Sequence, residues 1–258
     1  MPDAPPDLSE DVARDRLRTV LARIDAAAAS AGRDPSEVRL VLATKTQPPA
    51  SVRAAVMAAR HLGREVLVGE NRVQELVAKA ETFADLGCTP HLIGPLQSNK
   101  VNRALDVLLA AAQPGCVESV ATPETATRLG ARAGSMGRVL DVMVQVNVSG
   151  ELSKSGVPPQ EALELAVRVA AHPGLRLVGL MTIGARSPDV GVVRSGFATL
   201  RGLRDTLLAS GAPGTSGAAA LSMGMSGDLE AAVAEGATIV RVGTAVFGGR
   251  VQTPAVSR

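Results

Sequence analysis

Eight short apolar segments recur along this sequence, each separated from the next by a stretch long enough to form a helix. The apolar segments are residues 38–43, 66–69, 91–94, 116–119, 139–147, 175–183, 219–223 and 238–242. Strands that alternate with helix-length segments are typical of βαβ units, which build a parallel sheet. Several of the segments are apolar on both faces, as buried parallel strands are. The alternation therefore predicts an α/β protein.

The number of units favours a single (β/α)8 TIM barrel, because the 258 residues are close to the usual barrel length of about 250. An open doubly wound sheet is the competing arrangement, since periodicity alone does not count strands. Before the first strand, residues 8–32 carry apolar side chains at helical spacing and predict one additional N-terminal helix. We expect one domain over residues 8–250, with flexible termini at residues 1–7 and 251–258.

The segments between the strands predict the surrounding helices. They are rich in alanine, leucine, arginine and glutamate, and the longest comprise residues 49–62, 70–86, 159–172 and 190–210. Pattern and composition of this kind are typical of amphipathic helices that cover a sheet. A shorter helix is expected at residues 229–235, directly after a stretch rich in glycine and serine.

Charge and cysteine usage exclude several classes of protein. The 27 basic and 25 acidic residues nearly balance and are scattered, which gives no electrostatic case for a nucleic-acid partner. Cys88 and Cys116 have no metal-ligand spacing and suggest no disulfide framework. The acidic, proline-rich start is unlike a signal peptide, and no apolar run is long enough to span a bilayer. We therefore expect a cytoplasmic protein without a membrane partner.

Chemistry in a β/α-barrel takes place at the carboxyl ends of its strands. The first strand ends in Thr44-Lys45-Thr46, so that a lysine closes an apolar strand. Burial of its amine is costly unless the amine reaches water, an anion or a carbonyl. Desolvation also lowers the pKa of an amine, which a lysine that forms a Schiff base requires. The alternative is a lysine at a strand end that extends into solvent.

The scarcity of lysine bears on this choice. Lysine occurs at positions 45, 79, 100 and 154, whereas the other 23 of the 27 basic residues are arginine. A guanidinium group does not form an imine. A chain that uses arginine so freely is expected to keep a lysine where a primary amine is needed, which favours a reactive Lys45.

The ends of the seventh and eighth strands carry signals for phosphate. Glycine and serine, including Ser226, precede a helix and offer backbone N–H groups and a hydroxyl. Arg241 lies within an apolar strand that ends at Gly243 and Thr244. Barrels commonly bind phosphate after these two strands, so the signals support each other. The alternatives are an ordinary N-cap at Ser226 and an Arg241 that pairs with a barrel carboxylate.

Other catalytic patterns are missing from the sequence. His61, His91 and His172 have no spacing to acidic residues that indicates a zinc site or a catalytic triad. There is no GxSxG, no Walker A loop, and no GxGxxG with an acidic partner.

These same segments resemble the pyridoxal phosphate homeostasis protein family, whose barrel is similar to the N-terminal domain of alanine racemase. The resemblance spans positions 43 to 248 in consistent order. Its motifs are Ala43-Thr-Lys-Thr, Gly69-Glu-Asn-Arg-Val-Gln-Glu, His91-Leu-Ile-Gly-Pro-Leu-Gln-Ser-Asn-Lys, Val144-Gln-Val-Asn-Val, Ser153-Lys-Ser-Gly, Gly179-Leu-Met, Leu221-Ser-Met-Gly-Met-Ser and Arg241-Val-Gly-Thr-Ala-Val-Phe-Gly. The chain departs from the family at Arg72 and Pro90, where relatives often have aromatic residues.

The resemblance implies that pyridoxal 5′-phosphate (PLP) forms a Schiff base with Lys45. It implies further that the cofactor contacts Asn71, Ser222, Met223, Ser226, Arg241, Gly243 and Thr244. Of these, Ser226, Gly243 and Thr244 are expected to hold the phosphate, and Arg241 to face the pyridine nitrogen. Asn71 is expected to line the pocket.

A cationic arginine at the pyridine nitrogen disfavours its protonation and weakens the cofactor as an electron sink. Racemases of the alanine racemase type also use a tyrosine base from a second domain, and this sequence has no tyrosine. We therefore expect a binding protein that holds and supplies PLP in vitamin B6 homeostasis, without strong catalysis of its own. The alternatives are a PLP-dependent racemase or decarboxylase of low activity, a Schiff-base aldolase without cofactor, and a pure interaction protein.

Apo forms of PLP-dependent enzymes are the expected recipients of the cofactor, and the chain is expected to be a monomer. Lys100 and Lys154 are candidates for secondary amine sites during transfer, although exposed loop lysines explain them equally well.

Overall fold

The protein is a closed barrel of eight parallel strands, seen in a computed structural model that describes residues 7–110, 114–151 and 153–249. The strands pair in chain order, and β1 pairs with β8 to close the barrel. They are β1 (Arg39–Ala43), β2 (Val66–Glu70), β3 (Pro90–Leu92), β4 (Cys116–Val120), β5 (Leu140–Gln145), β6 (Leu175–Met181), β7 (Ala220–Ser222) and β8 (Ile239–Val242). The predicted (β/α)8 barrel is confirmed, and the open doubly wound sheet is excluded.

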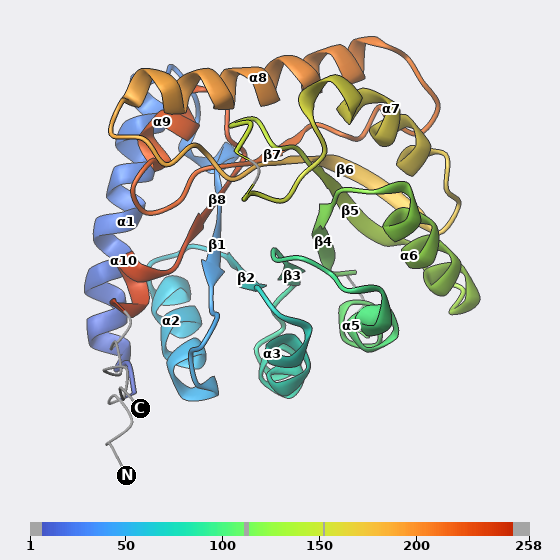
Figure 1. Ribbon diagram of the computed structural model, residues 1–258. Helices are drawn as coiled ribbons and strands as arrows, with labels where there is room; N and C mark the ends of the chain where they lie inside the picture. The colour runs from blue at the N-terminus through green and yellow to red at the C-terminus, as the bar shows by residue number, and fades with distance from the viewer. Residues whose placement is uncertain (1–6, 111–113, 152, 250–258) are drawn as a thin grey trace, which may run out of the picture.

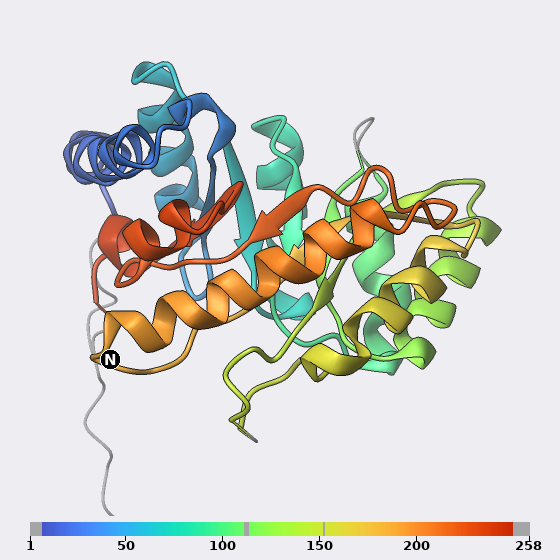
Figure 2. The same cartoon turned by 90° about the horizontal axis from the view of Figure 1, so that it is seen from above.

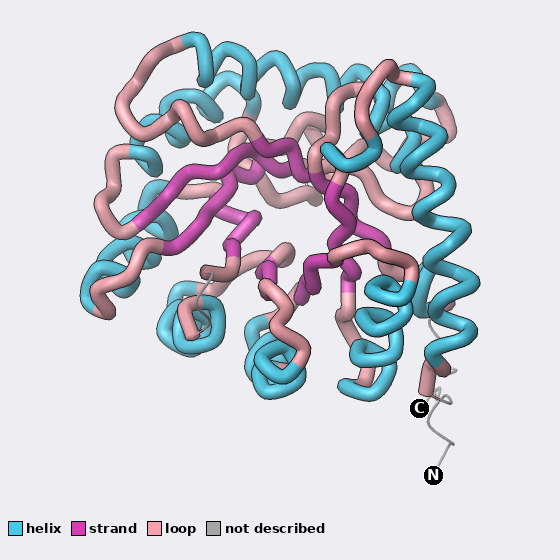
Figure 3. The backbone as a smooth tube through the Cα atoms, turned by 180° about the vertical axis from the view of Figure 1, so that it is seen from behind, coloured by secondary structure: helices cyan, strands magenta, loops and turns pink. Residues whose placement is uncertain are grey.

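Helices surround the barrel, as Figure 3 shows by the cyan helices outside the magenta strands. They are α2 (Pro49–His61), α3 (Val73–Ala78), α4 (Ala80–Asp85), α5 (Val101–Leu108), α6 (Pro123–Ser135), α7 (Pro159–Ala170), α8 (Val190–Ala209), α9 (Leu229–Ala234) and α10 (Thr244–Phe247). Two 3₁₀ turns, η1 (Pro35–Glu37) and η2 (Ser98–Lys100), lie before β1 and α5. Every strand is followed by at least one helix, as the sequence pattern predicts.

The predicted N-terminal helix is confirmed as α1 (Glu10–Ser30). It begins at Ser9, whose hydroxyl accepts a hydrogen bond from the N–H of Val12 at 3.4 Å, which is the usual N-cap interaction. Leu17 and Ile24, two turns apart, lie on its buried face. Figures 1 and 2 show α1 along the outside of the barrel, where it packs against α2, α9 and α10.

The interior of the barrel changes from apolar to polar along its axis. The apolar layer consists of Val41, Cys116, Met143, Met181 and Ile239. Side chains alternate between the two faces of a strand, so the residues two positions farther along also point inward. In the next layer these are Ala43, Glu118, Gln145, Ile183 and Arg241. Buried polar groups therefore lie toward the carboxyl ends of the strands.

One predicted element is wrong. The helix expected over residues 70–86 is divided into α3 and α4, and its first residue, Glu70, belongs to strand β2 instead. Lys79 separates the two helices with φ −108° and ψ 6°. Its ammonium group is hydrogen-bonded to residues of β2 and the β1 end. Local sequence pattern favours one helix, but these distant contacts override it.

None of the helices in the described part of the chain is both long and apolar enough to cross a membrane. The predicted flexible termini lie outside the described residues, except for Asp7. The boundaries of the single domain stay a prediction.

Candidate functional site

Lys45 lies two residues after the end of β1, at the carboxyl end of the barrel, and it is half-buried. It belongs to the run of alternate positions Val41, Ala43 and Lys45, of which Val41 is in the interior apolar layer. The alternation therefore directs Lys45 toward the mouth of the barrel rather than toward the covering helices. This is the position that the sequence predicts for a reactive amine.

The residue before Lys45 is held by a buried network. The backbone N–H of Thr44 donates to the carbonyl of Gly69 at 2.9 Å, and its hydroxyl donates to Glu70 Oε1 at 2.6 Å. Lys79 Nζ donates both to the carbonyl oxygen of Thr44 at 2.7 Å and to Glu70 Oε1 at 2.6 Å. Thr44, Glu70 and Lys79 are all buried. The backbone that carries Lys45 is thus fixed to the next strand.

Glu70 is the least satisfied member of this network. Its Oε2 atom is buried without a hydrogen-bond partner in the described structure. Burial raises the pKa of Glu70, and the hydrogen bonds from Lys79 and Thr44 oppose this only partly. The carboxyl group is retained at a cost in stability, which is expected where it orders a site rather than the fold alone.

The residue after Lys45 is held as well. The N–H of Thr46 donates to Glu75 Oε2 at 2.6 Å, and Thr46 has φ +62°. A positive φ is unfavourable for a β-branched residue and persists where the surroundings fix it. Lys45 therefore lies between two fixed neighbours, which restricts the directions that its amine can take.

The ends of β7 and β8 bring the predicted phosphate residues together. Thr244 Oγ1 donates to Ser226 Oγ at 3.4 Å, a long hydrogen bond that a stronger acceptor would replace. Gly243 adjoins the end of β1, because a Cβ atom there would lie 3.3 Å from the carbonyl oxygen of Ala43. The three residues thus lie beside the strand end that carries Lys45.

Helix α1 supports this group. Arg23 Nη2 donates to the carbonyl of Ser226 at 3.0 Å, and its guanidinium also pairs with Glu230 at 2.6 Å. The hydrogen bond that Arg23 donates to Glu230 raises the pKa of Arg23. Local sequence pattern contains no signal for this contact, because the two partners are far apart in the chain.

Arg241 is buried inside the barrel and shared among neighbours. Its Nη1 donates to Ser222 Oγ at 2.7 Å, and its Nη2 donates to the carbonyl of Thr182 at 2.7 Å. Glu118 Oε2 lies 4.0 Å from Nη1. Burial lowers the pKa of Arg241, which the charge of Glu118 opposes. The alternative interpretation, an arginine beside a barrel carboxylate, therefore describes a real contact of Arg241.

Glu118 joins Arg241 to the opposite wall of the barrel. Its Oε2 accepts from Ser222 Oγ at 2.5 Å, and its Oε1 lies 2.6 Å from His91 Nδ1. Burial would raise the pKa of Glu118, but hydrogen bonds from His91 and Ser222 and the charge of Arg241 outweigh it, so the pKa is lowered. A continuous set of buried contacts runs from His91 to Arg241.

The lowered pKa of Glu118 predicts a pH-dependent contribution to stability. A carboxylate whose pKa is lower in the folded state stabilises that state above its unfolded pKa, about 4.3 for glutamate, and loses the contribution as pH falls through the folded pKa. Glu118→Gln is therefore expected to cost most near neutral pH and progressively less below about pH 4.3. Urea unfolding of both proteins across this range measures the difference. A difference that is constant with pH would contradict the prediction.

Asn71, Ser222 and Met223, the other residues expected to contact the cofactor, lie in three different surroundings. Asn71 is half-buried after β2, and Gly94 lets its backbone approach closely, since a Cβ at Gly94 would overlap the carbonyl of Asn71. Ser222 points inward to Glu118. Met223 is fully buried in the core between barrel and helices, so its side chain does not join the others.

Lys154 and Lys100, the candidates for secondary amine sites, differ in their surroundings. Lys154 Nζ donates to Glu151 Oε1 at 2.6 Å and to the carbonyl of Gly184 at 2.8 Å, which holds it in the loop after β5. This contact lowers the pKa of Glu151. Lys100 is half-buried at the end of η2.

Sequence reasoning missed the residues that support the site: Glu70, Lys79, His91 and Glu118. One signal was available, because Glu118 is an acidic residue within an apolar strand, just as Arg241 is a basic one. The described residues contain no group of three or more His, Cys, Asp or Glu side chains that could hold a metal ion. A cavity of about 460 Å³ lies between the loop after β5 and the start of α8, lined by Val148, Asp189 and Val192 among others.

Comparison with known families agrees with this geometry. The alanine racemase N-terminal domain family matches residues 16–251, which covers every strand of the barrel. The fold and the lysine at the end of its first strand thus define a barrel of the alanine racemase N-terminal class.

Individual relatives show which group within this class the chain belongs to. The pyridoxal phosphate homeostasis protein of Pseudomonas aeruginosa is 42% identical over 236 residues, which are 92% of this chain and 95% of that protein. PipY of Synechococcus elongatus, solved with PLP bound, is 32% identical with a TM-score of 0.75, and the match covers 92% of this chain and 100% of PipY. An unknown protein from Bifidobacterium adolescentis is 42% identical with a TM-score of 0.86, over 95% and 98% of the two chains. This chain belongs to the pyridoxal phosphate homeostasis protein family.

Proposed function

We propose that this chain binds PLP as a Schiff base on Lys45 and serves PLP homeostasis and supply. One observation carries the proposal: a lysine fixed at the end of β1 lies beside a group of hydroxyl and glycine residues at the ends of β7 and β8. An aldehyde and a phosphate are the two ends of PLP that such a pair would hold. The solved PLP complex of PipY supports the choice of cofactor.

The residues present fit the cofactor. Ser226 and Thr244 supply hydroxyl donors for a phosphate, and Gly243 leaves room where a side chain would approach Ala43. Arg241 supplies a fixed cation to the ring, and Asn71 a polar side chain at the rim. Met223 would contribute through its backbone, because its side chain is buried in the core. Bound PLP would supply a reactive aldehyde, which the Lys45 amine captures with loss of water.

We further propose that the protein holds PLP rather than using it in catalysis. Arg241 is anchored to Ser222 and to the carbonyl of Thr182, so its cationic group cannot easily leave the ring. A cation at this place keeps the pyridine nitrogen unprotonated and weakens the electron sink. A racemase or decarboxylase of low activity is the second candidate. Exchange of amino-acid α-protons in heavy water, well above the rate with free PLP, would favour that candidate.

The extent and setting of the function are further proposals. Residues 8–250 would form the one PLP-binding domain, acting as a cytoplasmic monomer that supplies apo-enzymes. The name of the curated relatives supports homeostasis as the role. A Schiff base hydrolyses reversibly, which suits a protein that releases what it holds.

The direct test is to locate the modified lysine. Protein loaded with PLP is reduced with borohydride, digested, and mapped by mass spectrometry. We expect the label on the peptide that contains Lys45, while Lys79, Lys100 and Lys154 are unlabelled at equimolar cofactor. A label on another residue, or none, would refute the proposal.

A further inference from the structure

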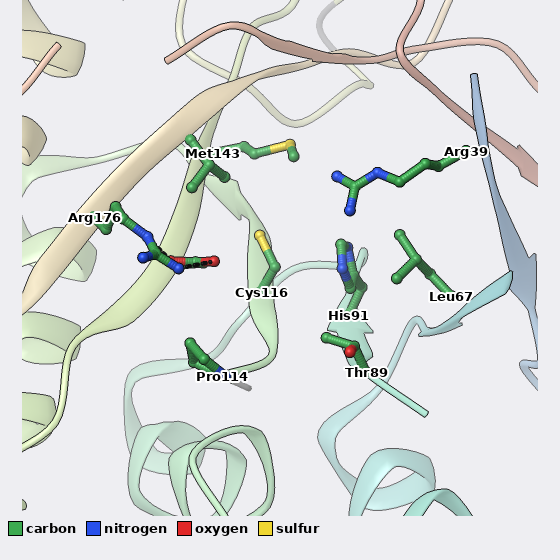
Figure 4. A pocket seen from close by; sticks show the side chains of 10 residues that line it. Arg39, Leu67, Thr89, His91, Pro114, Cys116, Met143 and Arg176 are labelled. Atoms are coloured by element: carbon green, nitrogen blue, oxygen red, sulfur yellow. Dashed lines mark hydrogen bonds and ion pairs between the residues drawn. The ribbon is translucent and has the colours of Figure 1, made fainter. Parts of the chain in front are cut away.

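A cavity of about 220 Å³ lies at the opposite end of the barrel from Lys45. Its lining comes from the first residues of several strands, including Arg39 of β1 and Cys116 of β4. Figure 4 shows these side chains around one space. The proposed function makes no use of this end of the barrel.

One of the side chains that line the cavity is an exposed cation, Arg39. The Arg39 side chain makes no hydrogen bond or ion pair with any residue in the described ranges. In Figure 4 its guanidinium extends from β1 toward the space above His91. Arg176, on the far side, is instead held by Asp141 through two contacts of 2.6 and 2.8 Å. The charge of Asp141 is thereby neutralised, and Arg39 leaves the cavity with an excess positive charge.

His91 gives the cavity a polar wall. It is 4% exposed, and its Nδ1 faces Glu118 at 2.6 Å. A carboxylate accepts only, so Nδ1 carries the hydrogen. With the hydrogen on Nδ1, Nε2 of a neutral ring is an acceptor, so it faces the cavity as a polar atom that a hydrogen-bond donor could approach. The hydroxyl-bearing Thr89 lies on the same wall.

The rest of the lining is apolar, with Leu67, Met143 and Val178 among its members. The volume is below the range of about 300–1,000 Å³ that is usual for drug-sized ligands, so the occupant must be small. A guanidinium binds a carboxylate with two parallel hydrogen bonds. A carboxylate is therefore the anion that best neutralises the charge of Arg39 at this end of the barrel.

We propose that this amino-terminal mouth is a second binding site, for a small carboxylate with a short aliphatic chain. The carboxylate pairs with Arg39, and the aliphatic chain contacts Leu67 and Met143. The site does not depend on the proposed PLP function, because Arg39, Leu67 and Met143 lie at the opposite end of the barrel from Lys45. The two ends are connected through His91, which lines the cavity and is bonded to Glu118.

The test is a titration with sodium butyrate followed by NMR of the methionine methyl groups. The Met143 methyl signal, assigned by its loss in Met143→Leu, is expected to shift and saturate in the wild type. Arg39→Gln removes a charge-assisted pair and should weaken binding roughly tenfold or more. Arg39→Lys should recover part of the affinity. Arg53→Gln is the matched control, because Arg53 is an exposed arginine of α2 that pairs with Asp85.

Butan-1-ol, which has the same chain without the charge, should give no saturable shift. Lys45→Ala protein should bind butyrate as the wild type does, so that failure of the PLP proposal is a separate result. Absence of a saturable Met143 shift would overturn the site, and so would equal affinity in Arg39→Gln. Equal binding of inorganic phosphate would overturn its assignment to carboxylates.

Discussion

Replacing Lys45 with arginine is expected to abolish covalent cofactor binding while the barrel stays folded. Arginine keeps the positive charge and most of the length of the side chain, but its guanidinium forms no imine. The residues proposed for the phosphate are unchanged, so PLP would still bind, but reversibly and more weakly. The measurement is the visible absorption of the Schiff base after addition of PLP, together with equilibrium dialysis.

Lys100→Arg and Lys154→Arg make the same chemical change at the other two lysines outside the buried network. Both variants are expected to keep the absorption band. A band of undiminished intensity in Lys45→Arg would show that another amine captures PLP, and the assignment of the site would then be wrong.

Replacing Lys79 with methionine is expected to be the most destabilising single change at the site. It removes the cation that accompanies Glu70, whose side chain is 0% exposed, and leaves a buried carboxylate with one partner fewer. Loss of one member of a buried ion pair costs about 3–5 kcal/mol. The Thr44 carbonyl also loses a donor at 2.7 Å, so the backbone that carries Lys45 should become less ordered. Urea unfolding followed by circular dichroism measures the loss.

Lys100→Met is the matched control, with an expected change of within about 0.5 kcal/mol. The double variant Lys79→Met/Glu70→Gln tests the cause, since it removes the buried charge as well as its partner. It should recover more than half of the lost stability. If Glu70→Gln brings no recovery, the effect of Lys79 comes from packing rather than from its charge.

The fold could be predicted from the sequence almost completely. The spacing of apolar residues and the lengths of the segments between strands are local properties of the sequence. All eight strands occur where the apolar segments predict them, and α1 lies within the predicted helical segment 8–32. The prediction failed at residues 70–86. The helical sequence pattern continues through Lys79, but the helix itself is interrupted there. That break depends on contacts of Lys79 to Thr44, which is 35 positions away in the chain, and to Glu70, which belongs to strand β2.

The candidate site was predictable where residues are unusual for their position. Lys45 stands out as a lysine at an apolar strand end, and Arg241 as an arginine within one. Glu70 and His91 do not stand out, because each is an ordinary polar residue beside a strand end or start. Their importance comes from partners that the barrel brings to them: Thr44 at the end of β1 is bonded to Glu70 at 2.6 Å, and Glu118 of β4 lies 2.6 Å from His91. Met223 shows the converse, a motif residue whose side chain faces away from the site.

The bond from Arg23 to the carbonyl of Ser226 joins residues 203 positions apart in the chain. Contacts of such separation form late in folding, because a long loop must close first. During synthesis, the lysine emerges from the ribosome long before the strand ends that are proposed to hold the phosphate. A nascent chain is therefore expected to remain unable to retain PLP until the segment after β7 has docked against α1 and β8 has paired with β1.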